Sequence, residues 1–218
     1  MRPSNSLLLG LGLLALAGCG GGKGGTTEQA QEGTTPEGCT HAQAHAHPNG
    51  GYKNEHLHLD PAKTYRLVFV TNCGTFTVTL NQKLAPNATG SLVSLARRGF
   101  FTDTSFHRIV RGFVIQGGDP TGTGTGGPGY ETHDTVPKTA AYLHGVVAMA
   151  KTGTEAPGTA GSQFFVVTGQ DAGLPPDYAI VGKVTKGLAV VDRIGLLGDV
   201  NEQPTANVVI SKVEVETS

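Results

Sequence analysis

The residues from Phe106 to Asp119 constrain the fold of this chain more than any other stretch. They read FHRIVRGFVIQGGD, with apolar residues on both sides of the Arg111-Gly112 pair. Apolar runs of this length, interrupted by a glycine, predict two short strands joined by a turn. Arg108 and Gln116 stand inside these strands, where apolar or small polar side chains are more usual. This polar pair therefore needs a functional explanation.

The rest of the chain supplies the elements of one mainly β domain. Helices are expected at 85–98, where Pro86 suits a first turn and Gly99 suits an end, and at 186–194. Further strands, rich in β-branched and aromatic residues, are expected at 65–71, 75–80, 145–150, 163–168, 179–184 and 207–215. With 38% hydrophobic residues, 218 residues can build one such core. The order of elements predicts a closed antiparallel β-barrel whose open ends are covered by helices.

Charge and the glycine pattern exclude two classes of ligand. The formal net charge is −1, so the chain lacks the basic surface that attracts a phosphate backbone, and we expect no nucleic acid partner. Gly122, Gly124 and Gly127 match the spacing G-x-G-x-x-G. However, Pro128 and Gly129 follow where a nucleotide-binding helix would have to begin. We therefore interpret this stretch as a tight surface loop.

The N-terminus predicts export and a lipid anchor. Arg2 precedes an apolar run from Leu7 to Leu16, which is too short to span a bilayer and has the length of a signal-peptide core. The run ends in Leu-Ala-Gly-Cys, which resembles a bacterial lipobox. We expect a signal peptide at 1–18, lipidation of Cys19, and attachment to the extracytoplasmic side of a membrane in the cell envelope. An ordinary cleaved signal with a nearby cysteine is the alternative.

Two segments separate Cys19 from the predicted domain. Residues 19–38 are rich in Gly, Thr and Glu and predict a flexible tether. Residues 39–63 form a histidine-rich approach segment with His41, His45, His47, His56 and His58. Their spacing could place imidazoles around Zn²⁺, Cu²⁺ or Ni²⁺, but it matches no specific zinc module. The favoured interpretation is a solvated segment with His56 and His58 on one face of a short strand; metal binding is the alternative.

The remaining cysteines, Cys39 and Cys73, lie in a chain that we expect to be exported, where thiols tend to be oxidised. A disulfide between them would attach the end of the tether to the domain. Two free thiols are the alternative, because pairing geometry cannot be read from spacing alone.

Several ordered blocks resemble the cyclophilin family of peptidyl-prolyl cis/trans isomerases, from about Tyr65 to the C-terminus. The blocks are Phe106-His107-Arg108-Ile109, Gly112-Phe113, Gln116-Gly117-Gly118-Asp119, Met149-Ala150, Gly161-Ser162-Gln163-Phe164-Phe165 and Val181-Gly182-Lys183-Val184. The resemblance implies that 64–218 is a mainly β, closed eight-stranded antiparallel barrel capped by two α-helices. It also implies a peptide groove on the outer face and no cofactor. We expect a monomer.

The residue types suit this chemistry. Rotation about an X-Pro bond is opposed by amide resonance, and a charged donor beside a proline-sized pocket would stabilise the twisted amide. Arg108 can be that donor, and Gln116 can hold the arginine while donating to a substrate carbonyl. By the resemblance, the substrate-binding residues are Phe113, Val114, Met149, Ala150, Phe165, Leu174 and Tyr178. Val114 replaces a methionine and Tyr178 a histidine that are common in the family.

The expected function is isomerisation of X-Pro bonds in proline-containing segments of unfolded or exported proteins, assisting folding at the cell envelope. Two alternatives from other classes remain. One is a peptide-binding scaffold or holdase whose isomerase activity is incidental. The other is a metal-binding envelope lipoprotein that uses the histidine-rich segment.

Overall fold

The computed structural model describes residues 38–218. The predicted signal peptide at 1–18, the lipidation site at Cys19 and all but the last residue of the tether lie outside these residues. Within the described part, no helix is long and apolar enough to cross a membrane. The elements in chain order are β1 (Tyr65–Thr71), β2 (Gly74–Leu80), α1 (Pro86–Arg97), β3 (Thr104–Ser105), β4 (Arg108–Val110), β5 (Val114–Gly117), β6 (Thr132–His133), β7 (Val146–Met149), β8 (Thr159–Ala160), β9 (Phe164–Val167), β10 (Ile180–Lys186), α2 (Leu188–Gly195) and β11 (Val209–Thr217).

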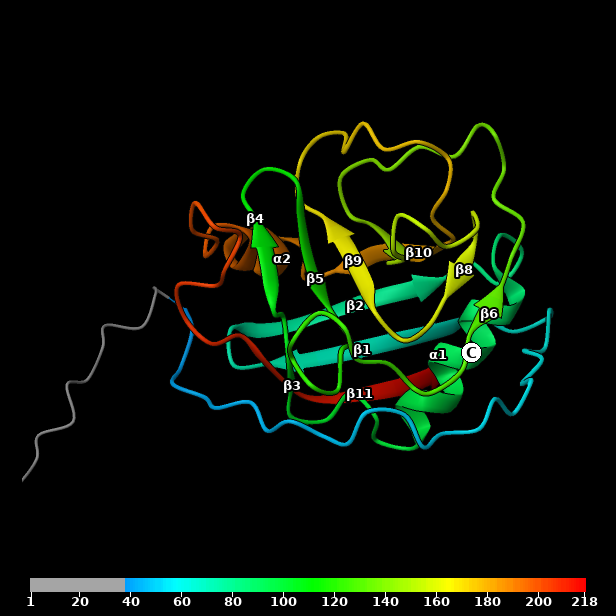
Figure 1. The fold of residues 1–218 in the computed structure, drawn as a ribbon, viewed down its shortest axis with the longest axis horizontal. Coiled ribbons are helices and arrows are strands. Elements are labelled where there is room, and N and C mark those ends of the chain that lie inside the picture. The colour runs from blue at the N-terminus through cyan, green and yellow to red at the C-terminus, as the bar shows by residue number, and fades with distance from the viewer. Residues whose placement is uncertain (1–37) are drawn as a thin grey trace, which may run out of the picture. The chain divides into compact units, whose positions relative to one another are not determined.

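Nine strands form one curled antiparallel sheet in the order β3-β11-β1-β2-β10-β7-β9-β5-β4. The fold is mainly β with two helices, as expected, but the prediction of a closed eight-stranded barrel is wrong. The sheet is a half-barrel that stays open between β3 and β4 (Figure 1). Only Phe106 and His107 separate these two short strands in the chain, so β3 and β4 follow one another and do not pair side by side.

The inner face of the sheet holds the main core, which we call the inner cluster. Its centre is aromatic. Phe69 stacks on Phe76 with ring centroids 4.8 Å apart, and Phe164 lies between Phe69 and Phe106 at 5.2 and 6.0 Å. These rings come from four strands or their flanks, and each is 2% exposed or less. Alternation along β1 produces this arrangement, because Leu67 and Phe69 are buried while Val68 between them is only half-buried.

Helix α1 begins at Pro86, as the sequence predicts, but a distant residue caps it. The N-cap Ala85 has no side chain that could accept a hydrogen bond. Instead the buried Asp134 carboxylate accepts the backbone N–H groups of Asn87 and Ala88 at 2.9 and 2.8 Å. A carboxylate at this end also interacts favourably with the helix dipole. The loop that carries Asp134 is thereby fixed to the helix.

Residues 39–60, which we call the strap, lie along the domain in an extended path without regular secondary structure (Figure 1, blue to cyan). Backbone N–H groups of His45, His47 and Tyr52 donate to Asp103, Pro120 and Pro128 in the domain. The Tyr52 ring also packs edge-on against Phe100 at 4.9 Å, and Leu57 and Leu59 pack against the inner cluster. The strap is therefore part of the packed structure.

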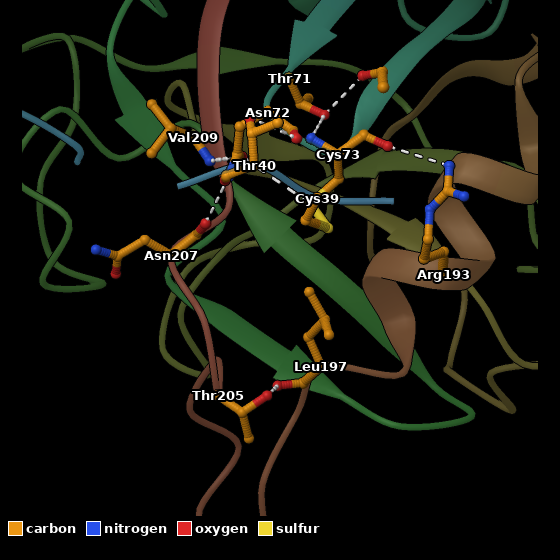
Figure 2. Close-up of a disulfide and its surroundings, with 11 residues drawn as sticks. Cys39, Thr40, Thr71, Asn72, Cys73, Arg193, Leu197, Thr205, Asn207 and Val209 are labelled. Carbon is orange, nitrogen blue, oxygen red and sulfur yellow. Dashed lines mark hydrogen bonds between the residues drawn. A yellow bond between two sulfur atoms is a disulfide. The ribbon is translucent and has the colours of Figure 1, made fainter. Parts of the chain in front are cut away.

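A disulfide joins the start of the strap to the domain. Cys39 and Cys73 are bonded, and both belong to the inner cluster. Figure 2 shows the bonds around it. The Asn72 amide donates to Thr40 and Asn207, and the Arg193 guanidinium of α2 donates to the Cys73 carbonyl at 3.1 Å. The turn between β1 and β2 is thus tied to the strap, to the chain entering β11 and to α2.

The strap histidines are spread along this path. Among residues 38–218 there is no group of three or more His, Cys, Asp or Glu side chains that could hold a metal ion. His47 bonds the Thr102 carbonyl through Nε2 at 2.6 Å. The short strand expected at His56 and His58 is not formed, and His56 adopts a positive φ of 48°. The backbone there is therefore incompatible with an extended strand.

Candidate active site

The hairpin of β4 and β5 places Arg108 directly opposite Gln116. The register pairs Arg108 with Gln116, Ile109 with Ile115, and Val110 with Val114. The turn between the strands contains Gly112 at a φ of 67°, a conformation that glycine adopts without strain. This confirms the two short strands and the turn predicted at 111–112. Because side chains alternate across a strand, Arg108 and Gln116 share one face and Ile115 enters the inner cluster on the other.

A chain of hydrogen bonds runs outward from this pair. The Arg108 Nη1 group donates to Gln116 Oε1 at 3.2 Å, and Gln116 Nε2 donates to Gln163 Oε1 at 3.0 Å. Gln163 Nε2 in turn donates to the carbonyls of Gly124 and Gly126 at 3.0 and 2.9 Å. On its other side, Arg108 Nε donates to the Glu202 carboxylate at 2.7 Å. The guanidinium is therefore held from two sides.

Beside this polar chain lies a second apolar group, which we call the outer cluster. Its buried members are Val114, Tyr142, Ala148, Phe165 and Val167. Half-buried residues pack against them, and these include Phe113, Ala150, Leu174 and Tyr178. Gln116 pairs in register with Phe165, so the polar chain and the outer cluster meet on adjacent strands. The structure thus brings Arg108, Gln116, Phe113, Val114, Phe165, Ala150, Leu174 and Tyr178 onto one face.

Met149 does not join them. Its side chain has no exposed surface and belongs to the inner cluster, whereas its neighbours Ala148 and Ala150 belong to or pack against the outer cluster. The reason is the alternation of side chains along β7, which sends every second residue to the opposite face. The prediction that Met149 binds substrate is wrong for its side chain.

Two tyrosines fix the far side of the outer cluster. The Tyr142 hydroxyl donates to the Tyr178 carbonyl at 2.9 Å and accepts the Tyr178 N–H at the same distance. Burial raises the pKa of the Tyr142 hydroxyl, so this group stays a neutral donor and acceptor. The Tyr178 ring meets Phe165 edge-on at 5.6 Å. The segment that carries Leu174 is thus anchored at both the backbone and the ring.

The glycine-rich loop after β5 is folded around its own carboxylate. The buried Asp119 side chain accepts the N–H groups of Thr121, Gly124 and Gly126 and the Thr121 hydroxyl. Burial by itself would raise the pKa of Asp119, but these bonds outweigh it and hold the pKa below its ordinary value. The N–H groups that could have held a phosphate are already bonded, as the prediction of a tight surface loop requires. The strap supports this loop, because Asn49 Oδ1 accepts the Gly127 N–H at 2.9 Å.

The loop borders an open pocket of about 600 Å³. Gln116 and Ala150 also line this pocket. Ala150 packs against the outer cluster, and Gln116 pairs with Phe165 of that cluster, so the pocket lies on the same face. Lys151, Glu155 and Glu131 bring charges of both signs to its wall. The face therefore combines an apolar patch, a guanidinium and a polar recess.

His107 precedes Arg108 in the chain, and its ring lies against the glycine-rich loop. Its imidazole lies 3.8 Å from the position that a Cβ would take at Gly124, and neither ring nitrogen has a hydrogen-bond partner within residues 38–218. Burial lowers its pKa more than the nearby Asp119 carboxylate raises it, and Arg108 adds to the lowering. His107 is therefore a neutral packing residue at pH 7.

Two residues of this site were not predicted from the sequence. Gln163 stands within the block Gly161-Ser162-Gln163-Phe164-Phe165, so the resemblance to the family is a signal that could have indicated it. Glu202 lies in the turn between α2 and β11, outside every such block, and nothing in its local sequence indicates that it meets Arg108. Only the tertiary structure joins residues that lie 94 positions apart.

A family model described as cyclophilin-type peptidyl-prolyl cis-trans isomerase/CLD matches residues 66–215, which is more than half of the chain. This chain belongs to the cyclophilin family. It is a peptidyl-prolyl cis/trans isomerase, a name that its relatives also carry. The match begins after the strap, so the strap lies outside the family's common domain.

Relatives and solved structures of this family agree. The chain is 40% identical over 153 residues to peptidyl-prolyl cis-trans isomerase-like 1 of Neurospora crassa, covering 66% of this chain and 90% of the relative. It is 37% identical over 150 residues to a peptidyl-prolyl cis-trans isomerase of Helicobacter pylori, covering 62% and 90%. A cyclophilin-type isomerase from Cryptosporidium parvum superposes with a TM-score of 0.65 at 30% identity, covering 70% of this chain and 98% of that one. The same parasite protein was also crystallised in the presence of the dipeptide Ala-Pro, with a TM-score of 0.64.

Proposed function

We propose that this isomerase acts on X-Pro bonds of exported proteins at the cell envelope, with Arg108 and Gln116 as its catalytic residues. The observation that carries the assignment is the position of the Arg108 guanidinium, held by Gln116 on the same face as a half-buried apolar patch. The Ala-Pro dipeptide used with the parasite relative is consistent with a proline-containing substrate here.

The reaction needs no nucleophile. The barrier to rotation is about 18–20 kcal/mol, and moving from minutes to milliseconds requires a lowering of roughly 6–7 kcal/mol. When the X-Pro bond twists, conjugation is lost and the imide nitrogen regains its lone pair. Arg108 would donate an N–H to that nitrogen, which attracts a positive charge more strongly in the twisted state than in the planar one. This difference between the two states is what accelerates the rotation.

The neighbouring residues would bind the peptide. Phe113, Phe165 and Leu174 would enclose the proline ring, with Val114 behind them and Tyr178 at the rim. The Ala150 N–H already donates to the Gln163 carbonyl. The Ala150 backbone would therefore pair with the peptide through its C=O. Gln116 would donate to a substrate carbonyl while its Oε1 keeps Arg108 in place.

The lipid on Cys19 would hold the enzyme at the membrane, and the segment from Cys19 to the strap would give the domain reach toward emerging clients. The support for this part is the N-terminal sequence alone. The same compartment suits the disulfide between Cys39 and Cys73, because oxidising conditions favour such bonds.

The test of the catalytic assignment is the rate of cis/trans isomerisation of a proline peptide by the mature chain. Removing a charged donor from the reacting centre lowers kcat/KM by about 100-fold or more, so we expect this for Arg108→Ala. Arg66→Ala is the matched control, because Arg66 is another strand arginine whose guanidinium bonds only Ser218 within the described residues. An Arg108→Ala variant as fast as the control would refute the role of Arg108 and favour a peptide-binding scaffold.

The anchoring has its own test, which does not depend on activity. Bacterial cells expressing the full chain are fed labelled palmitate, and the membrane and soluble fractions are separated. We expect label on the wild-type chain in the membrane fraction and no label on a Cys19→Ser variant. Equal release of both chains into the soluble fraction would show that the signal is an ordinary cleaved one.

A further inference from the structure

Glu202 adopts a backbone conformation that its residue type disfavours. Its φ is 64°, in the left-handed region, where side chains other than glycine, asparagine and aspartate are uncommon. Residues with positive φ among 38–218 are mostly glycines, and only His56 and Asp103 share this feature with Glu202. Glutamate occupies this position although glycine would fit the turn without strain. Such an outlier points to a role for the side chain.

The turn that carries Glu202 is docked on the free edge of β4. The Glu202 carbonyl accepts the Ile109 N–H at 3.0 Å, and Arg111 Nε donates to the Gly198 carbonyl at 2.6 Å. Inside the turn, Asp199 Oδ1 accepts the N–H groups of Asn201 and Gln203, both at 2.8 Å. The backbone of Glu202 is thereby fixed beside Arg108, which immediately precedes Ile109.

From this backbone the Glu202 side chain reaches Arg108. Its Oε2 lies 2.7 Å from Arg108 Nε, with the two side chains 48% and 34% exposed. Gln116 takes one hydrogen of Nη1, so two of the five N–H groups of the guanidinium are bonded within residues 38–218. The other three, on Nη1 and Nη2, are available to a substrate. The two bonds fix both the plane and the direction of the guanidinium.

We propose that Glu202 is a positioning residue for the isomerisation. It orients Arg108 through Nε so that the free N–H groups face the twisted amide, and Gln116 completes the alignment. The inference rests on the proposed catalytic role of Arg108. A half-exposed ion pair contributes little to folding, so the effect is on alignment and hence on rate.

Substitution of Glu202 separates alignment from stability. In Glu202→Gly the strain of the left-handed residue is removed, so we expect the variant to unfold at the same or a higher temperature. At the same time kcat/KM falls by about 10-fold, because the guanidinium is no longer fixed at Nε. Glu202→Gln keeps an oxygen acceptor at the same distance and loses less than about 3-fold. A purely structural role would move activity and stability in the same direction.

Three controls make the test decisive. Asn201→Gly adds glycine to the same turn without touching Arg108 and leaves kcat/KM unchanged. In an Arg108→Ala background, Glu202→Gly has no further effect, because the group that it orients is absent. In ¹⁵N NMR spectra, the Arg108 Nε–H signal of the wild type is protected from exchange with solvent and loses this protection in Glu202→Gly.

The activities of the variants separate the positioning role of Glu202 from the catalytic role of Arg108 on which it depends. If Arg108→Ala retains full activity, the catalytic assignment itself fails. If Arg108→Ala is slow but Glu202→Gly matches the wild type, only the positioning role is overturned. A faster Glu202→Gly or Glu202→Gln overturns it as well, because the carboxylate would then compete with the substrate for Arg108.

Discussion

The two faces of the half-barrel are built from the same strands but differ in what they leave exposed. On the inner face, Phe164 and its neighbours form a closed aromatic core. On the outer face, Phe165 is buried but Phe113, Leu174 and Tyr178 keep part of their surface open, beside the polar chain that begins at Arg108. Consecutive residues of β9 thus belong to opposite faces, with Phe164 in the closed core and Phe165 in the outer cluster that we propose binds substrate. Position relative to the pleat, and not residue type, therefore decides whether a phenylalanine joins the closed core or the half-open face.

The largest expected effect tests this contrast directly. Phe164→Ala removes a ring with 1% exposure from the inner cluster, and we expect the free energy of unfolding to fall by about 3–5 kcal/mol. Phe113→Ala is the matched variant on the outer face. We expect it to keep most of its stability and to lose about 10- to 100-fold in kcat/KM, because the proline ring loses its apolar contact. Urea unfolding and the isomerisation assay measure the two quantities. Equal losses of stability in both variants would contradict the expectation that the inner face contributes more to stability than the outer face.

The disulfide extends the inner cluster to the strap, and its removal should be the next largest effect. Cys39 and Cys73 are 34 residues apart, and closing a loop of this length stabilises the folded chain by about 3–4 kcal/mol in the chain-entropy model. Reductant should lower the midpoint of urea unfolding accordingly and speed hydrogen exchange at the strap amides of His45, His47 and Tyr52. A Cys39→Ser/Cys73→Ser double variant is the control and should not respond to reductant. Wild-type unfolding that is identical with and without reductant would refute this stabilisation.

The smallest expected effect is a pH dependence from His107, next to the polar chain. Its folded pKa lies below the ordinary 6.5 because burial disfavours the charged form. Well above pH 6.5 the imidazole is neutral in both the folded and unfolded states, so its contribution is constant. As the pH falls below 6.5, the unfolded chain takes up the proton first, and the free energy of unfolding decreases until the folded pKa is reached.

The control for this titration is the variant His107→Leu compared with His45→Leu. His45 is exposed on the strap, so its replacement controls for the loss of one histidine without removing a buried imidazole. His107→Leu should lose part of the decrease in unfolding free energy that occurs as the pH falls below about 6.5. Parallel curves for all three proteins would mean that the burial of His107 does not affect its protonation.

Local patterns predicted most elements well. Helix α1 begins at Pro86 as expected, and β1 has the bounds of the predicted strand at 65–71. The β4–β5 hairpin follows from apolar runs on both sides of Gly112, because a glycine at positive φ suits the turn between them. The prediction that the barrel closes was wrong. Pairing between β3 and β4 depends on how the chain runs between them, and the composition of either strand does not reveal this.

The candidate site was predicted in part for a similar reason. Arg108 and Gln116 stand eight residues apart in one hairpin, so their meeting depends on local register alone. The inward direction of Met149 depends on the phase of β7 in the sheet, which no local pattern sets. The strap looked like a solvated approach because its composition is polar. The ordered path of the strap comes from backbone hydrogen bonds and the disulfide, which amino-acid composition does not indicate.

Motifs and contacts between near neighbours in the chain were enough to predict the family, the reaction and the hairpin that carries Arg108 and Gln116. The open sheet, the packing of the strap along the domain and the contact between Glu202 and Arg108 could be seen only in the folded structure. Each of these joins segments far apart in the chain. Such contacts depend on how all the elements pack together and cannot be read from any one of them.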